Sequence, residues 1–430
     1  MQSERFLNKV TAFIRSKEAQ VHVYDELKHH IEHSKNAWLK KGYTPDEAER
    51  KAIDEMGSPS ALGKSMDKIH RPKVDWLLIS LVAILLGASF IPILTFDSTV
   101  IFGADMTNYF IRNKWLHLLC AVILIAALMY IDYRKLERFS LAIYLGALIL
   151  LMILNYFPTA MVSGQSYLMV GPVQIQAWTV LPLLLIAWAG FFTQKKLNSW
   201  QLIILFVLPL WFILSTPNLT AALIYTGVVT VLFYLSDYSL KSKIMTSITV
   251  IGLIASTMFL ITPQLHHYQL VRIYAFLNPE SYATQEGYVY LVIKNALNEA
   301  GWFGAETIRY IPEGHTDFAL VQLIQEHGYI AGIAVVTVLF AIAIRILWKA
   351  KQLARSYGKL LVIGALSFYC MQFGYSVAMI LGWLPIIGLS LPFISYGFTS
   401  LLINSFVIGI ALSVYRRKTF IGSGVQQNYS

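Results

Sequence analysis

About ten apolar stretches of roughly membrane-spanning length follow one another through most of this 430-residue chain. A helix needs about 20 mostly apolar residues to cross the hydrocarbon core of a bilayer, and several stretches reach that length only with their flanking residues. The stretches are 76–96, 114–131, 140–156, 176–193, 200–215, 219–236, 244–262, 318–345, 360–386 and 396–414. Because a helix in lipid satisfies its own backbone hydrogen bonds, the pattern predicts an all-α, polytopic membrane protein with about ten transmembrane helices.

Charge separates the first 75 residues from the remainder. They hold 14 Lys and Arg and 12 Asp and Glu, whereas the other 355 residues hold only 20 and 12. We therefore predict a small soluble helical domain at 1–73, a transmembrane domain at 74–418 and a tail at 419–430. The polar start contains no pattern typical of a cleavable signal peptide. Membrane topology accounts for the excess positive charge in the short loops, so we expect no nucleic-acid partner.

Lys and Arg are unevenly divided between the two sets of connecting segments. With the N-terminal domain in the cytoplasm, fifteen fall in cytoplasmic loops and the tail, and five fall in external segments. That bias is typical of a multi-pass protein of the bacterial cytoplasmic membrane with both termini cytoplasmic. The external segments at 97–113, 157–175 and 263–317 are long, and such loops usually carry function. The five external cations are Arg112, Lys114, Arg272, Lys294 and Arg309.

The N-terminal domain is predicted to be a short helical bundle. Apolar residues recur at helical spacing in 6–14 and again in 23–39, and residues 44–47 (Thr-Pro-Asp-Glu) have the form of a capping box. His29 and His33 would share one helix face, as two metal ligands do. A solvated polar face is the favoured interpretation, because no Cys or carboxylate set completes a site. We expect this domain to dock a cytoplasmic regulator.

Ionisable residues cluster where the longest external segment enters a span. Glu313, His315 and Asp317 fall within five residues, and Glu326 follows about two turns further into the span. An aspartate at a helix start is often only an N-cap. Ionisable groups in membrane segments are costly, however, and usually mark function. We therefore take this cluster as the candidate site.

The same cluster lies in a recognisable motif. Residues 311–318 (Ile-Pro-Glu-Gly-His-Thr-Asp-Phe) resemble the signature around the essential aspartate of the SEDS family, the shape, elongation, division and sporulation proteins typified by RodA and FtsW. Residues 391–397 (Leu-Pro-Phe-Ile-Ser-Tyr-Gly) resemble the family's pattern before its last span. Looser similarity in 272–288 and at 301–304 matches the family's external loop and a glycine-rich run.

The chain also departs from the family's pattern. The family's Gln-Pro-Ser-Glu turn reads Gln-Ala-Trp-Thr at 176–179, so its glutamate is absent. Its Pro-Asp-Leu-Gly-Thr motif reads Pro-Asn-Leu-Thr-Ala at 217–221, so an aspartate is lost. The family's basic pair is not found near 164–167, and a double glycine reads Gly-Phe at 397–398. These departures bear on substrate binding more than on the proposed base.

The resemblance implies a peptidoglycan glycosyltransferase that polymerises the polyprenyl pyrophosphate-linked precursor lipid II, commonly beside a class B penicillin-binding protein. Asp317 would act as the general base on the acceptor sugar's 4-hydroxyl. The leaving pyrophosphate needs positive charge, for which Arg272 and Lys294 are the best candidates and Arg309 is a weaker one. A divalent cation would also serve, but no ligand set identifies one. The remaining candidate substrate-binding residues are Glu313, His315, Thr316, Glu326, Ser395 and Tyr396.

Two other functions stay open at this stage. About ten spans with broken helices also suit a flippase for lipid-linked precursors, although the nearly charge-free spans count against it. A non-catalytic scaffold is favoured by the lost carboxylates and opposed by the retention of Asp317. A plain receptor leaves the matching motifs unexplained. The sequence does not distinguish a role in elongation, division or sporulation.

Overall fold

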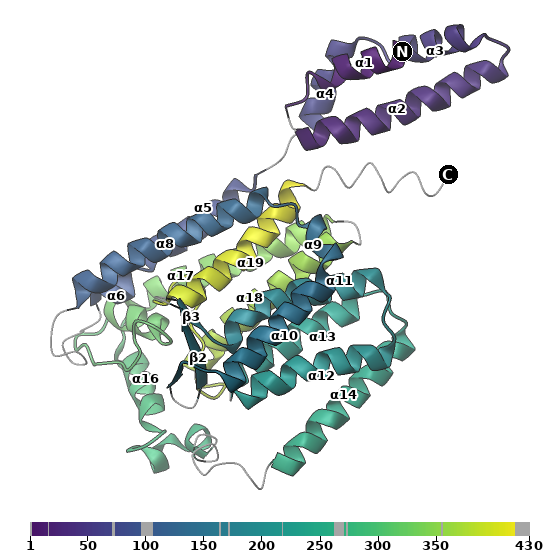
Figure 1. The fold of residues 1–430 in the computed structure, drawn as a ribbon. Helices are drawn as coiled ribbons and strands as arrows, with labels where there is room; N and C mark the ends of the chain where they lie inside the picture. The colour runs from purple at the N-terminus through teal and green to yellow at the C-terminus, as the bar shows by residue number, and fades with distance from the viewer. Residues whose placement is uncertain are drawn as a thin grey trace. The chain divides into compact units, whose positions relative to one another are not determined.

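The computed structural model divides the chain into two compact units (Figure 1). One unit contains Met1–Asp75 with Tyr415–Ser430, and the other contains Trp76–Val414. The structure describes residues 2–15, 17–70, 74–95, 106–162, 165–170, 173–216, 218–261, 271, 274–353 and 356–417.

The described residues of Met1–Asp75 form the helices α1 (Gln2–Thr11), α2 (Lys17–Lys40), α3 (Pro45–Glu55) and α4 (Pro59–His70). Their apolar faces form a small core, as expected for amphipathic helices. The predicted apolar stripe of α2 stays buried only up to Ile31, because the helix extends past the bundle core. The buried core residues are Phe6, Leu7, Val10, Ile14, Ala19, Val23, Leu27, Ile31 and Ala52.

The predicted capping box begins α3. The Thr44 hydroxyl accepts a hydrogen bond from the Glu47 backbone N–H at 3.4 Å, and the Glu47 carboxylate accepts one from the Thr44 N–H at 3.1 Å. Each bond satisfies a donor that a helix start would leave unpaired. His29 and His33 are exposed on α2.

The larger unit is mostly helical, and each predicted apolar stretch falls on a helix. Its helices are α5 (Trp76–Ala88), α6 (Ile91–Thr95), α8 (Thr107–Tyr130), α9 (Arg134–Arg138), α10 (Ser140–Tyr156), α11 (Ala177–Gln194), α12 (Ser199–Ser215), α13 (Leu219–Leu235), α14 (Leu240–Ile261), η2 (Pro279–Tyr282), α16 (Tyr288–Glu299), α17 (Ala319–Lys351), α18 (Tyr357–Ile380) and α19 (Phe398–Arg416).

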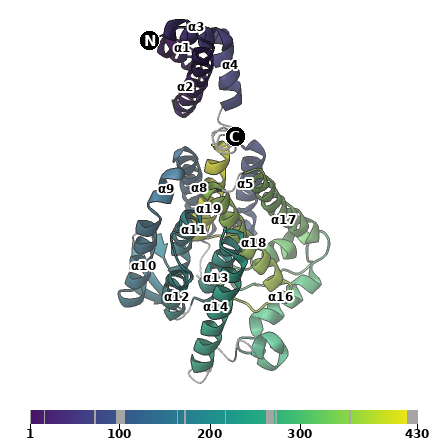
Figure 2. The same ribbon diagram turned by 90° about the vertical axis from the view of Figure 1, so that its right-hand side faces the viewer.

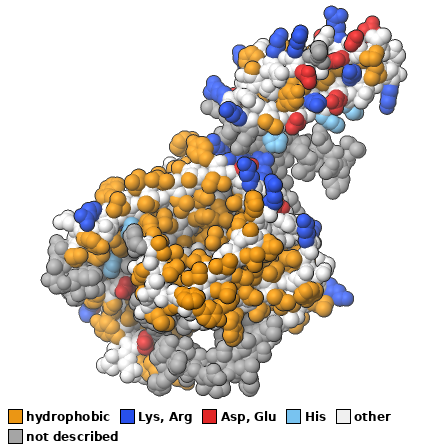
Figure 3. All heavy atoms as spheres, in the orientation of Figure 1, with side chains coloured by type: hydrophobic (Ala, Val, Ile, Leu, Met, Phe, Trp, Pro, Cys, Tyr) orange, Lys and Arg blue, Asp and Glu red, His pale blue; other side chains and the backbone are white. Residues whose placement is uncertain are grey.

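Six segments within the described residues are long and apolar enough to cross a membrane, and three apolar helices are shorter. Several carry large exposed apolar side chains, such as Trp115, Trp211 and Phe340. Hydrophobic side chains cover the face of this unit seen in Figure 3, and most charged side chains lie at its margins. The chain is therefore a multi-pass membrane protein, because such a surface is stable only against lipid.

Helix α11 lies at the centre of the larger unit. It packs against α10, α13 and α18 (Figure 2). Nearly all its side chains are therefore buried. Helices α12 and α13 pack side by side, and the carboxamide oxygen of Asn218 caps α13 by accepting from the Ala221 N–H at 2.9 Å. Thr216 and Asn218 thus lie between two neighbouring helices.

The all-α prediction is wrong in one segment. Strands β1 (Ala160–Val162), β2 (Gln165–Val170) and β3 (Val173–Ile175) form a three-stranded antiparallel sheet in the order β1-β2-β3. Ala160 pairs with Tyr167, and Leu168 pairs with Ile175. These strands are only three to six residues long. They lie in the segment 157–175, one of the three long segments predicted to be external.

Helix α17 is broken at Gly328, which has φ +82°. A Cβ there would lie 2.1 Å from the Trp302 carbonyl oxygen, so only glycine fits. The glycine-rich run at 301–304 fills the break: the Tyr329 N–H donates to the Gly301 carbonyl at 3.1 Å, and the Gln325 carbonyl accepts from Ala305 at 2.7 Å. The run thus pairs backbone groups that the break would leave unsatisfied.

Candidate active site

A tight turn presents Asp317 just before α17. The Glu313 carbonyl accepts from the backbone N–H groups of Thr316 and Phe318 at 3.0 and 3.1 Å, and Glu313 itself has φ +52°. A Cβ on Gly314 would lie 2.6 Å from the Gln322 carboxamide oxygen, at the end of a flexible side chain, and 3.0 Å from the Ile311 carbonyl oxygen, so the turn favours a small residue there. The signature at 311–318 is therefore a folded backbone unit that fixes where the aspartate lies.

Asp317 does not cap the helix that follows it. The N-cap residue of α17 is Phe318, and no side chain caps this end. Burial, and to a smaller extent the negative charge of Glu313, raises the pKa of Asp317 to about 7. A Cβ on Gly388 would meet the Asp317 carboxylate at 3.4 Å. A partly buried carboxylate of near-neutral pKa with no role as a cap is a candidate acid or base.

Asp317 lines a cavity of about 990 Å³ within the larger unit. The walls come from α8, strands β2 and β3, the starts of α11, α13 and α19, and the two motif loops at 311–318 and 388–397. Ligand cavities commonly have about 300–1,000 Å³. The polar lining consists mainly of amides and hydroxyls: Asn113, Gln165, Gln174, Gln176, Asn218, Thr220, Thr316, Ser390, Thr399 and Ser400.

Aromatic side chains stand near the carboxylate. Tyr167 on β2 lines the cavity, and burial together with the charge of Asp317 raises its pKa. The rings of His315 and Tyr396 are 5.9 Å apart, and the Tyr396 N–H donates to the His315 carbonyl at 2.8 Å. The two motif loops are therefore joined beside the cavity. Burial lowers the pKa of His315, so its imidazole is neutral at pH 7.

A fully buried lysine lies behind this wall. The ammonium group of Lys114 on α8 donates to the Ser395 carbonyl at 3.2 Å, and the Ser395 hydroxyl accepts from the Leu391 N–H at 2.8 Å. No carboxylate pairs with Lys114 among the described residues. The sequence showed Lys114 only as a cation at the edge of an apolar stretch. Its contact partner is 281 residues away, so no local pattern revealed this role.

The other predicted site residues fall in different places. Glu313 is exposed, and its carboxylate accepts from the Thr316 hydroxyl at 2.6 Å. Glu326 accepts from the Gln322 carboxamide and does not line the cavity. Lys294 is exposed and lies 3.6 Å from Glu280.

Arg309 and Arg272 are the two remaining cations that were predicted to bind the pyrophosphate. Arg309 forms a two-pronged ion pair with Glu299 at 2.5 and 2.6 Å. Arg272 lies outside the described residues.

Departures from the SEDS pattern lie at or beside the cavity. Asn218, at the position of the family's aspartate, lines the cavity together with Thr220. Thr179, at the position of the family's glutamate, is not among the lining residues, although its neighbours Gln176 and Trp178 are. Asp317 is the only carboxylate among the described residues that line it. The described residues also contain no group of three or more His, Cys, Asp or Glu suited to a metal ion.

This chain is similar in sequence to several known proteins. The model of the FtsW/RodA/SpoVE family of cell cycle proteins matches residues 74–419. A probable peptidoglycan glycosyltransferase FtsW from Trichlorobacter lovleyi is 27% identical over 361 residues, 79% of this chain and 93% of that protein. Stage V sporulation protein E of Bacillus subtilis is 25% identical over 80% of this chain and 97% of that protein. The peptidoglycan glycosyltransferase MrdB of Escherichia coli is 23% identical, with coverages of 84% and 97%.

Two solved structures share the fold. One comes from a study of the structural coordination of polymerization and crosslinking by a peptidoglycan synthase complex. It aligns with a TM-score of 0.65 and 20% identity, over 80% of this chain and 98% of that chain. The rod shape determining protein RodA of Thermus thermophilus aligns with a TM-score of 0.58 and 19% identity, over 80% and 97%. At these identities the likeness concerns the fold.

Proposed function

This chain belongs to the FtsW/RodA/SpoVE family, and we propose on that premise that it is a peptidoglycan glycosyltransferase that polymerises lipid II. The observation that carries the proposal is Asp317, a partly buried carboxylate of near-neutral pKa in a cavity of about 990 Å³. A scaffold has no need of an unpaired carboxylate in such a space, because burying one costs stability.

In the proposed reaction, Asp317 accepts the proton of the acceptor sugar's 4-hydroxyl. The hydroxyl oxygen forms a bond to the anomeric carbon of the donor sugar. The bond from that carbon to the pyrophosphate oxygen breaks, and polyprenyl pyrophosphate leaves with the electron pair. A positioned general base accelerates such a step by about 10²–10⁴-fold when its pKa lies near the operating pH.

The cavity lining supports a sugar substrate. Amide side chains offer both donors and acceptors, which matches the hydroxyl and acetamido groups of a saccharide. Gln174, Gln176 and Thr399 belong to this lining, and the Thr399 hydroxyl donates to the Gln174 carbonyl at 2.9 Å. Because this lining is mostly neutral, hydrogen bonds would determine which sugar binds. No second carboxylate among the described lining residues competes with Asp317 for the proton.

Positive charge for the leaving pyrophosphate comes, in this proposal, from Lys114 with the predicted cations Arg272 and Lys294. Lys114 acts through the field of a buried ammonium group, which is strong where water is excluded. Its bond to the Ser395 carbonyl also holds the loop that carries Tyr396. A divalent cation can share this task.

We further propose ten transmembrane spans with both termini in the cytoplasm, because Lys and Arg concentrate in one set of loops. The cavity then opens toward the outer face, where lipid II is polymerised. The structural relative from a peptidoglycan synthase complex supports a class B penicillin-binding protein as partner. The N-terminal unit is available to a cytoplasmic regulator.

The test is polymerisation of lipid II by the purified full-length chain and its Asp317→Asn variant, with glycan products separated on a gel. We expect polymer from the wild type and a loss of at least about 100-fold in the variant. Glu306→Gln, an exposed carboxylate in the same external segment, serves as the matched control and should keep full activity. Absence of polymer from the wild type, with and without a class B penicillin-binding protein, would favour the scaffold.

A further inference from the structure

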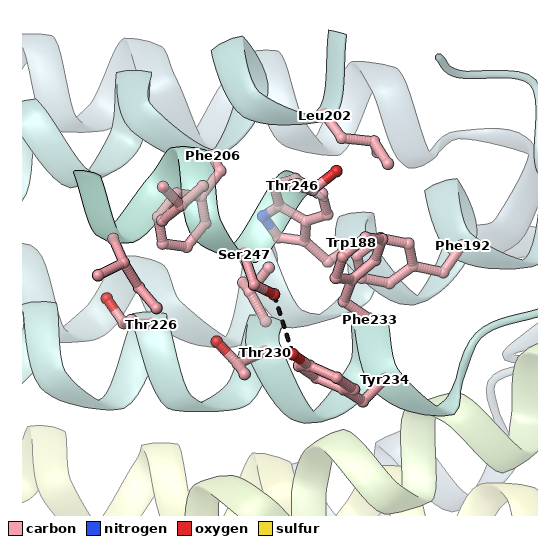
Figure 4. Close-up of a pocket in the computed structure, with 13 residues that line it drawn as sticks. Trp188, Phe192, Leu202, Phe206, Thr226, Thr230, Phe233, Tyr234, Thr246 and Ser247 are labelled. Carbon is pink, nitrogen blue, oxygen red and sulfur yellow. Dashed lines mark hydrogen bonds between the residues drawn. The ribbon is translucent and has the colours of Figure 1, made fainter. Parts of the chain in front are cut away.

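A second cavity lies far along the helices from the first, between α11, α12, α13 and α14. Its volume is about 190 Å³, and Figure 4 shows Trp188, Phe192, Phe206 and Phe233 around it. We call it the tail cavity. An apolar cavity of about 150 Å³ already holds a benzene ring, so this one is large enough for part of a hydrocarbon chain.

The tail cavity also carries hydroxyl groups. Thr246 on α14 is only 7% exposed, lines the cavity, and its hydroxyl has no hydrogen-bond partner among the described residues. The neighbouring Ser247 lies 3.1 Å from the Tyr234 hydroxyl (Figure 4). A buried hydroxyl without a partner costs free energy. The cavity therefore suits a ligand that is mostly apolar but brings an acceptor to Thr246.

A third cavity of about 330 Å³ adjoins the tail cavity, and both are lined by Phe192. We call it the lysine cavity, because Lys195 and Lys359 line it. Lys195 lies 3.1 Å from Asp237, whereas Lys359 is partly buried and has no ion pair or hydrogen bond within the described part of the chain. Asp237 lines the same cavity, so its described charged residues, Lys195, Lys359 and Asp237, leave one net positive charge there. The lysine cavity is thus suited to an anion.

The two cavities are layered along the helix axes. Lys243 on α14 donates to the Ser236 carbonyl at 2.6 Å, beside the lysine cavity, and Thr246 lies about 4.5 Å further along the same helix. On α11, Trp188 lies about 10 Å from Lys195, measured along the helix axis. The cations therefore come first, Thr246 follows at about the depth of Phe192, which lines both cavities, and Trp188 lies deeper. A glycerophospholipid has the matching order of phosphate, ester carbonyls and acyl chain.

We propose that these cavities form one binding site for an anionic glycerophospholipid. The phosphate lies in the lysine cavity, an ester carbonyl accepts from Thr246, and one acyl chain lies in the tail cavity. Helix α14 packs mainly on α12, so the lipid fills the space between α14 and its neighbours. On the proposed topology this lipid belongs to the cytoplasmic leaflet, opposite the sugar-binding cavity.

The test measures lipid binding without turnover, so its outcome is independent of the polymerase proposal. The full-length chain in detergent is titrated with phosphatidylglycerol or with phosphatidylcholine of the same acyl chains, and bound lipid is counted by native mass spectrometry. We expect phosphatidylglycerol to bind more tightly. Each of Lys195→Gln and Lys359→Gln should weaken it about fivefold, since a lysine near anionic lipid contributes about 1 kcal/mol.

Lys196→Gln is the matched control, because Lys196 is exposed in the same loop and lines neither cavity. It should leave affinity within about twofold. Equal binding of the two lipids, or an equal loss in the control, would overturn the proposal. Tighter binding of a polyprenyl phosphate would assign the site to the carrier lipid instead, and equal binding of inorganic phosphate would reduce it to an anion site.

The tail cavity is tested separately with phosphatidylglycerol that carries brominated acyl chains, which quench nearby tryptophan. Quenching should fall when Trp188 is replaced by Phe, and Trp211→Phe, an exposed residue of α12, marks the contribution of bulk lipid. An unchanged quenching in Trp188→Phe would show that no acyl chain enters the cavity. If a variant fails to fold, the preference of the wild-type chain for phosphatidylglycerol over phosphatidylcholine still tests the proposal.

Discussion

The pH dependence of polymerisation follows directly from the burial of Asp317. A general base works only when ionised, and with a pKa of about 7 some one tenth of the carboxyl groups is ionised at pH 6 and nine tenths at pH 8. The rate at limiting lipid II should therefore rise about tenfold between pH 6 and pH 8. An ordinary aspartate would already be fully ionised at pH 6 and would give a flat profile.

Glu313 supplies a second, separable part of this prediction. Burial is the larger cause of the raised pKa, and the charge of Glu313 is the smaller one. Glu313→Gln should thus shift the midpoint of the profile to lower pH without flattening it, whereas Glu306→Gln should leave the midpoint unchanged. The assay is the initial rate of glycan formation from pH 5.5 to 8.5 with purified protein. A flat wild-type profile, or a midpoint that moves equally in both variants, would refute the reasoning.

Three other variants test the structure. Asp317→Asn should raise the thermal unfolding midpoint more at pH 8 than at pH 5, because the raised pKa means that the folded state loses stability as this carboxyl ionises. Gly328→Ala should destabilise the fold by about 1–3 kcal/mol or more, measured by thermal unfolding, while Gly87→Ala, with open space around it, should be neutral. Lys114→Met should lower polymerisation about tenfold or more in a folded protein, and a larger loss from Lys294→Met would show that Lys294 contributes more to the leaving group than Lys114 does.

Much of the fold was predictable because apolar length is a local property. All ten apolar stretches fall on helices, and the capping box at 44–47 is present, since both patterns lie within a few turns of chain. The break at Gly328 was missed, because a single glycine is compatible with a continuous helix and the cause of the break is the distant run at 301–304. The sheet at 160–175 was missed because its strands are too short to show a clear alternation.

The candidate site was predictable only where one motif contains it. Residues 311–318 form one turn, so Glu313, His315 and Asp317 come together through local hydrogen bonds. Lys114 and Tyr167 reach the cavity region from separate elements, and nothing in their neighbouring sequence indicates this. Tertiary packing, rather than any motif, brings them to the aspartate.

The central claim is that Asp317 receives the proton of a sugar hydroxyl in the cavity it lines. A structure of the Asp317→Asn variant with a lipid II analogue tests this most directly. The account predicts the acceptor sugar among the amides of the cavity, with its 4-hydroxyl about 2.6–3.2 Å from the residue 317 side chain. A sugar bound elsewhere, or a 4-hydroxyl directed away from residue 317, would contradict it.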